Sequence, residues 1–246
     1  SLLISAAMNL EIFRPSFIIR CCTPLLLITT VGQAEDWPGW RGPEGNNHAS
    51  AQTDVPLRWD IESGTNIVWK TAVPGRGHSS PVVVKDSIFL TTAETENQTQ
   101  SLLKFDRESG RMMDQWVLHR GTLPRRIHPN NSYASPTPVF DGENLFVVFH
   151  TDEAIWLTAV TTSGQKVWST HVCEFKPSAF QFGYGASPLI EDDLVIVAAE
   201  YDGAASGIYA FSRRTGKQVW MQHRPENLNF SSPIIATITG QRQLLL

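Results

Sequence analysis

A unit that recurs four times is the feature that most limits how this chain of 246 residues can fold. In each copy a Ser-Pro pair enters a run of β-branched residues, and a polar turn, a second apolar run, a glycine turn and a tryptophan follow. The Ser-Pro pairs stand at residues 80–81, 135–136, 187–188 and 232–233. The tryptophans are Trp69, Trp116, Trp168 and Trp220. Their spacing of about 50 residues is typical of solenoids, arrays and propellers.

The residues within one period indicate a blade of four short strands. Between Ser187 and Trp220, β-branched and aromatic residues gather in four runs, at residues 188–190, 194–198, 208–211 and 218–220. Polar and glycine-containing turns separate these runs. No stretch of helical period lies between them, which excludes helical repeats. The sequence therefore predicts an all-β fold, a β-propeller of four-stranded antiparallel blades.

The repeat also predicts how much of a propeller the chain contains. About three and a half blades fit into the sequence, which ends at residues 242–246 within the expected second strand of the fourth copy. A ring of seven or eight blades needs roughly 350 to 400 residues. We therefore interpret the chain as the N-terminal half of a larger propeller. The alternative is a half-ring that closes by dimerisation, since an open sheet edge invites pairing.

The overall charge limits the classes of partner. Hydrophobic residues make up 41% of the chain and aromatic residues 10%, which suits a protein with a buried core. The net charge is −4 and the isoelectric point is about 6.0. No basic field is therefore present to hold nucleic acid or an anionic membrane surface. We expect a protein or another component of the cell envelope as the partner.

The first 34 residues have the features of a leader. From Met8, two arginines precede a short apolar core at residues 21–31, and residues 32–34 offer a small-residue cleavage site. We expect residues 1–34 to be upstream sequence plus a signal peptide, residues 35–246 to form the partial propeller domain, and the protein to be exported to the periplasm, the cell envelope or the extracellular space. No other run reaches the roughly 18 apolar residues that a spanning helix needs. The alternative is an uncleaved N-terminal anchor.

Several segments resemble the pyrroloquinoline-quinone-binding-like β-propeller repeat family. They are residues 36–43, 66–70, 77–81, 104–110 and 210–220, and the resemblance covers nearly all of residues 35–246. The family includes quinoprotein dehydrogenases, which bind the quinone with calcium, and propeller scaffolds such as the outer-membrane assembly lipoprotein. Some of the dehydrogenases carry adjacent cysteines beside the quinone. Here Cys21 and Cys22 lie in the leader, and Cys173 is the only mature cysteine.

The glycines and tryptophans of the repeat have a structural interpretation. We expect Gly110, Gly164 and Gly216 to adopt positive φ in hairpin turns. Asp106 or Ser212 would brace such a turn. Alternation along the strand would then place each tryptophan against a neighbouring blade, where the indole is buried. This docking role is predicted for Trp69, Trp116, Trp168 and Trp220. The longer glycine-to-tryptophan interval in the first two copies predicts an insertion or a bulge there.

Candidate binding residues lie in the loops before each Ser-Pro pair, which converge near the axis of a propeller. A ring of aromatic, His, Arg and Asn side chains there suits a flat or anionic ligand, held by stacking and charge-assisted hydrogen bonds. The alternative is that the tyrosines plug the channel and the arginines form a solvated loop. The candidates are Arg76, His78, Arg126, His128, Asn131, Tyr133, Tyr184 and Phe230.

Two functions remain open. Hydrolase, P-loop and dinucleotide motifs are missing, and no His, Cys or Asp spacing is typical of a metal site, so no catalytic or metal-binding residue is assigned. The first hypothesis is an exported, non-catalytic propeller that binds a protein, a glycan or a small ligand. The alternative is a quinone-dependent alcohol or sugar dehydrogenase with calcium, whose catalytic residues lie partly beyond this chain. Glu200 and Asp202 are its nearest acidic candidates, and we expect both at a hairpin end. The third copy, at residues 159–164, is one residue short and lacks the Asp, which favours the first hypothesis.

Overall fold

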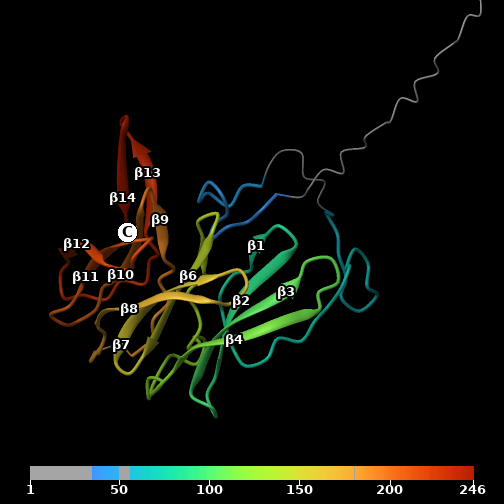
Figure 1. Ribbon diagram of the computed structural model, residues 1–246, viewed down its shortest axis with the longest axis horizontal. Helices are drawn as coiled ribbons and strands as arrows, with labels where there is room; N and C mark the ends of the chain where they lie inside the picture. Colours follow the sequence, from blue (N-terminus) through green and yellow to red (C-terminus); the bar gives the residue numbers. More distant parts are fainter. Residues whose placement is uncertain (1–34, 50–55, 180) are drawn as a thin grey trace, which may run out of the picture. The chain divides into compact units, whose positions relative to one another are not determined.

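The predicted β-propeller fold is confirmed by the computed structural model, which describes residues 35–49, 56–179 and 181–246. Within these residues every regular element is a strand, and the strands form three four-stranded sheets and one two-stranded sheet (Figure 1). Each sheet is an antiparallel meander in chain order, as expected of a blade. The expected leader at residues 1–34 lies outside the described residues.

The strand bounds follow the four repeats. The first blade contains β1 (Val82–Val84), β2 (Ser87–Glu94), β3 (Thr99–Asp106) and β4 (Met112–Arg120). The second contains β5 (Val139–Phe140), β6 (Asn144–Thr151), β7 (Ala154–Thr161) and β8 (Lys166–Glu174). The third contains β9 (Leu189–Glu191), β10 (Leu194–Ala199), β11 (Gly207–Ser212) and β12 (Gln218–His223), and the fourth sheet pairs β13 (Ile234–Ile238) with β14 (Gln241–Leu245).

The core lies between successive blades, and the alternation of side chains along β6 shows how it forms. Leu145, Val147 and Phe149 belong to a cluster with Phe89 and other residues of the first blade. The alternate residues of β6, among them Phe146 and Val148, belong to a cluster shared with the third blade. Because successive side chains of a strand point to opposite faces, one strand fills two interfaces. Residues 145–149 of β6 are therefore all apolar, because both faces of this strand are buried.

A tryptophan of one blade rests on a glycine turn of the next. Gly110, Gly164 and Gly216 have φ values of 69°, 86° and 68°. A Cβ atom added to these glycines would lie 2.3, 2.2 and 2.6 Å from the nearest indole atom of Trp69, Trp116 and Trp168, respectively. Only glycine therefore fits at each turn, both for its backbone angle and for the space beneath the indole. Trp220, on β12, packs against a small cluster of Ile196, Ile208 and Ala210, as do Leu244 and Leu246.

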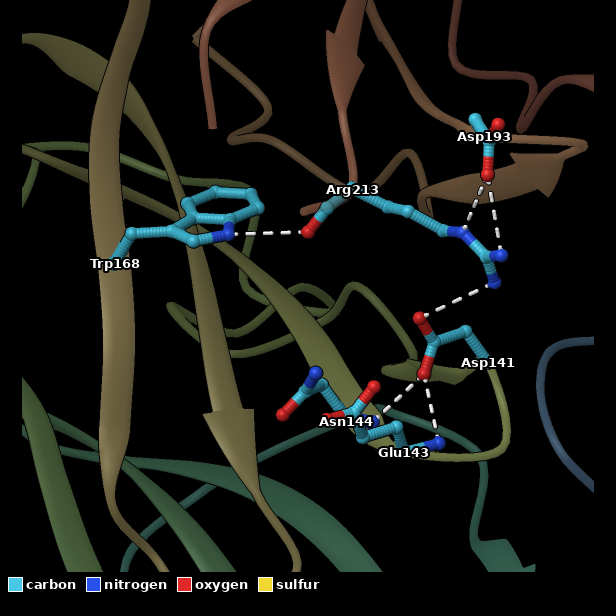
Figure 2. A network of polar contacts seen from close by, with 6 residues as sticks. All are labelled: Asp141, Glu143, Asn144, Trp168, Asp193 and Arg213. Atoms are coloured by element: carbon cyan, nitrogen blue, oxygen red, sulfur yellow. Dashed lines mark hydrogen bonds and ion pairs between the residues drawn. The ribbon is translucent and has the colours of Figure 1, made fainter. Parts of the chain in front are cut away.

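Hydrogen bonds lock this contact between the second and third blades. The Trp168 indole N–H donates to the Arg213 carbonyl oxygen over 3.1 Å, and the Arg213 guanidinium bridges Asp141 of the second blade and Asp193 of the third (Figure 2). An equivalent hydrogen bond occurs at the first blade, two blades earlier, where the Trp69 indole donates to the Arg107 carbonyl over 3.0 Å. Arg213 and Arg107, each three residues before a turn glycine, thus accept a hydrogen bond from the indole that rests on that glycine.

The bulge expected in the early copies is present in the first blade, and the later blades have one as well. Strand pairing shifts register near the start of the outermost strand in all three four-stranded blades, at Lys104/Phe105, Ala159/Val160 and Ala210/Phe211. The bulge is therefore a common property of the blades. The longer interval in the first blade arises because Trp116 lies opposite Leu102, further along its strand from the bulge than Trp168 or Trp220.

Candidate axial binding site

The inner strands begin at equivalent positions, and this corrects the register of the second repeat. A proline directly precedes Val82, Val139, Leu189 and Ile234, where β1, β5, β9 and β13 start. The second blade therefore begins with Thr137-Pro138, two residues after the expected Ser135-Pro136. Both dipeptides occur side by side in the sequence, and only the pairing of Val139 with Phe146 selects between them.

Hydroxyl groups at these positions link the inner strands into a ladder. The Ser80 N–H donates to Thr137 Oγ1 over 2.9 Å, the Thr137 N–H to Ser187 Oγ over 3.0 Å, and the Ser187 N–H to Ser232 Oγ over 2.9 Å. Each receiving oxygen thus accepts a bond from the preceding blade. Because a hydroxyl can also donate, Thr137, Ser187 and Ser232 keep a proton for a further acceptor. The ladder therefore holds three donors at defined positions.

A cavity of about 560 Å³ adjoins the ladder. Its described lining consists of hydroxyl, aromatic, cationic and apolar groups: Trp40, Arg41, His78, Ser80, Ser135, Thr137, Gly185, Ser187, Phe230, Ser231, Ser232, Ile234, Leu245 and Leu246. We call it the axial pocket. None of these side chains carries a carboxylate, so the polar side chains of the described lining are rich in donors. Such a lining favours a ligand that is anionic or rich in acceptor oxygens.

Arg41 supplies the formal charge of the axial pocket. Its guanidinium carbon lies 4.4 Å from the centre of the Trp40 ring, a cation–π arrangement, and its buried Nε has no hydrogen-bond partner. Arg41 has a φ of 68°, which glycine ordinarily adopts. An arginine held in this way against an indole is already ordered before a ligand arrives.

The segment before Arg41 reaches the pocket along the inner edges of two blades. Trp37 exchanges backbone hydrogen bonds of 2.8 and 2.9 Å with Val83 on β1, and the Phe140 N–H on β5 donates to the Pro38 carbonyl over 2.7 Å. Trp40 lines both the axial pocket and a second cavity of about 360 Å³, and Ser187, Ser232 and Ile234 are also common to the two linings. Sequence reasoning did not assign Arg41. No local pattern reveals its role, because its position depends on the hydrogen bonds of Trp37 and Pro38 to strands more than 40 residues further along the chain.

The structure distributes the predicted binding residues over different places. His78 and Phe230 line the axial pocket. The Tyr184 side chain is buried, and its hydroxyl donates to the Ala198 carbonyl over 2.8 Å. We call the residue three places before the proline of each inner strand the axial position; it is His78, Ser135, Gly185 or Phe230, and all four line the axial pocket. Tyr133 lies two residues before Ser135, and its carbonyl accepts a hydrogen bond of 2.6 Å from the Gln100 side chain.

The other candidates form contacts between neighbouring connections. The Arg76 guanidinium donates to the Pro129 carbonyl, and the Asn131 amide donates to the Phe182 carbonyl, each over 2.6 Å. The Phe182 ring lies 5.4 Å from the His128 ring and 5.6 Å from the Phe230 ring, centre to centre. Three connections thus contribute to one aromatic row that ends at the axial pocket. Arg126 lines a different cavity.

The two acidic candidates from the sequence, Glu200 and Asp202, do not fit the calcium of a bound quinone. Glu200 is 6% exposed, and its two oxygens accept hydrogen bonds of 2.6 Å from Arg224 and Asn229. Asp202 accepts bonds from Ser178 and Ala179 and so braces a connection. Calcium is bound by several oxygen ligands that other cations do not neutralise. The described residues contain no group of three or more His, Cys, Asp or Glu side chains that could hold a metal ion.

Comparison with known proteins assigns the chain to a family. The model of the family described as outer membrane protein assembly factor BamB matches residues 41–179 and 123–246. The chain belongs to this family and is a quinone-type propeller repeat protein. No curated protein matches it. No helix in the described part of the chain is long and apolar enough to cross a membrane.

Solved structures with a similar fold are much longer or only distantly similar. A europium-containing methanol dehydrogenase shares 13% identity (TM-score 0.41, 62% of this chain covered). Quinohemoprotein alcohol dehydrogenase ADHIIG from Pseudomonas putida HK5 shares 16% (TM-score 0.40, 62% covered), and BamB from Moraxella catarrhalis shares 15% (TM-score 0.34, 63% covered). The chain spans 26%, 21% and 51% of their respective lengths.

Proposed function

From the family and the axial pocket, we propose that this chain is an exported, non-catalytic binding module that holds an acidic segment of a cell-envelope protein. The observation that carries the proposal is the set of donors in the pocket. The hydroxyl groups of Thr137, Ser187 and Ser232 accept bonds within the ladder and can each still donate one to a ligand. The Arg41 guanidinium is already positioned against the Trp40 ring. A carboxylate side chain would accept from both, and charge-assisted hydrogen bonds of this kind are the stronger ones.

The aromatic row beside the pocket supports a protein as the partner. Phe182 and Phe230 are 38% and 54% exposed, and their ring centres lie 5.6 Å apart, so that together they present an apolar surface that reaches the lining of the axial pocket. Aromatic and arginine side chains are the residues that most often anchor protein interfaces. An acidic side chain in the pocket and an apolar neighbour on the row would be recognised together. The name of the family supports a role in the assembly of envelope proteins.

Site-specific photocrosslinking in cells tests the proposal. A benzophenone amino acid replaces Phe230 or, as the control, Val219, which is 57% exposed on β12. We expect a discrete protein adduct from position 230, none from position 219, and a weaker adduct in the Arg41→Ala background. Equal adducts from both positions, a glycan adduct, or no effect of Arg41→Ala would contradict the proposal.

A cofactor titration separates this proposal from the dehydrogenase alternative. The full-length protein is mixed with pyrroloquinoline quinone and calcium, and absorbance and dye-linked alcohol or sugar oxidation are recorded. We expect neither stoichiometric uptake nor turnover, because Arg224 and Asn229 already occupy the Glu200 carboxylate. Stoichiometric uptake with turnover would overturn the proposal.

A further inference from the structure

The connection from β12 to β13 forms one wall of the axial pocket. It covers residues 224–233, and Phe230, Ser231 and Ser232 near its end line the pocket. Ser232 also supplies a hydroxyl of the ladder, because its Oγ accepts the Ser187 N–H over 2.9 Å. The position of this connection therefore sets where an aromatic ring and a donor hydroxyl meet a ligand.

A buried carboxylate holds this connection at two points. Glu200 directly follows β10, and its side chain is 5% exposed. Its Oε1 accepts a hydrogen bond from Arg224 Nε at the start of the connection, and its Oε2 accepts one from Asn229 Nδ2 near the end, each over 2.6 Å. A desolvated carboxylate that loses one of two such partners is strongly disfavoured. The two bonds therefore fix the connection to the end of β10.

Asn229 transmits this constraint to the pocket wall. Its amide nitrogen donates to Glu200, while its Oδ1 accepts the Ser231 N–H over 2.9 Å. Phe230 lies between Asn229 and Ser231 in the sequence, so the chain is held on both sides of it. The Phe230 ring lies 5.6 Å from that of Phe182 on the preceding connection, centre to centre. The place of Phe230 thus depends on a carboxylate that does not itself line the axial pocket.

The start of the connection is also held in a second way, which separates positioning from folding. The Arg224 N–H donates to the Ser206 carbonyl over 3.0 Å, and Ser206 Oγ donates to the Pro225 carbonyl over 2.9 Å. Neither bond involves Glu200. Loss of the Glu200 contact near the end of the connection should therefore displace the pocket wall and leave the blade folded.

We propose that Glu200 is a positioning residue of the axial pocket, which acts through Asn229 to place Phe230 and Ser232 for the partner. The placement depends on the two hydrogen bonds of the carboxylate, whereas its effect on binding rests on the proposed function of the pocket. Because neither Glu200 nor Asn229 lines the axial pocket, variants at these positions change its geometry without removing a group that would touch the ligand.

Fluorine NMR of the full chain with 4-fluorophenylalanine at position 230 tests the placement without any partner. Asn229→Asp puts a second carboxylate against that of Glu200, and like charges so close repel. We expect the resonance to lose most of its offset from that of the urea-unfolded protein. The double variant Glu200→Gln/Asn229→Asp should restore the offset, because the Gln amide nitrogen donates to the Asp carboxylate and its oxygen still accepts from Arg224.

Two results of this experiment would overturn the proposal: a resonance that Asn229→Asp leaves unchanged, or no recovery in the double variant. If Asn229→Asp does not fold, Asn229→Ala removes the same bond without adding a charge, and the loss of offset is expected there. Glu226→Gln is the matched control, because it neutralises an exposed glutamate of the same connection, and it should leave the resonance in place.

Photocrosslinking in cells extends the test to the partner. A benzophenone amino acid replaces Phe182, which belongs to the aromatic row but not to the connection. We expect its protein adduct to be lost in Asn229→Asp, to return in Glu200→Gln/Asn229→Asp and to persist in Glu226→Gln. An adduct that persists although the fluorine resonance has moved would overturn the proposal. If no adduct forms even with Asn229 in place, the proposed function fails, and the fluorine resonance still decides whether Glu200 places the pocket wall.

Discussion

Replacement of Gly216 by alanine tests how two blades lock together. The added Cβ would lie 2.6 Å from the Trp168 ring, at a backbone φ of 68°. The indole cannot move aside freely, because its N–H donates to the Arg213 carbonyl over 3.1 Å (Figure 2). Its ring also packs against that of Phe146, with 5.8 Å between the ring centres. Gly216→Ala therefore combines two separate costs, backbone strain and overlap with the indole.

The two costs have different magnitudes. A left-handed backbone costs a residue with a Cβ about 1 kcal/mol. Overpacking against a fixed ring costs about 1 to 3 kcal/mol. We therefore expect Gly216→Ala to lower the free energy of unfolding by about 2 to 4 kcal/mol. Gly240 supplies the control, because it has a φ of 78° and open space around its added Cβ, so Gly240→Ala should cost only about 1 kcal/mol.

A double-mutant cycle isolates the contact. Trp168→Ala alone should cost about 2 to 4 kcal/mol, slightly below the range for a fully buried ring because the indole is half-buried. In the Trp168→Ala background, Gly216→Ala should cost only about 1 kcal/mol, since the ring that it overlaps is gone. Urea unfolding followed by circular dichroism measures all four proteins. Costs that add within about 0.5 kcal/mol would refute the docking contact.

Three further measurements test the described structure. Burial lowers the pKa of His119 and of His150 to about 4, so the unfolded state binds protons more readily than the folded one. The free energy of unfolding, measured with urea, should therefore fall by up to about 3 kcal/mol per group as the pH drops from about 6.5 to 4. A free energy that does not change with pH would contradict their burial. Burial raises the pKa of the Cys173 thiol to about 12, so a disulfide reagent at pH 8 should modify it only in denaturant. Thr137→Val removes the acceptor of the Ser80 N–H and should cost about 1 to 3 kcal/mol, whereas Thr137→Ser, which keeps the hydroxyl, should cost clearly less; equal costs would contradict the ladder.

The strand layout was predictable because it depends on neighbours in the chain. Apolar and β-branched runs between glycine turns correctly located all four strands of the third blade, and positive φ at Gly110, Gly164 and Gly216 followed from the turn. The bracing of the first hairpin was also predictable, since the Asp106 carboxylate accepts the Ser109 N–H three residues later. These are local constraints, and periodicity reports them directly.

Contacts between distant segments were not predictable in the same way. The sequence offers two X-Pro pairs at residues 135–138, and a choice of Ser135-Pro136 moved the axial position to Tyr133. Arg41 reaches the pocket only because Trp37 and Pro38 pair with β1 and β5. The turn between β6 and β7 likewise holds two connections at once, because Asp152 bonds to Thr122 and Glu153 bonds to Phe175.

The sequence by itself determined the repeat, the four-stranded blade and the residues that a blade needs at its turns, because a two-residue alternation and a glycine turn are written in consecutive positions. Only the tertiary structure decided the register of the second blade, the position of Arg41 and the packing of two connections against the turn between β6 and β7. These depend on hydrogen bonds between residues tens of positions apart. No local pattern records which of many compatible partners such a bond will join.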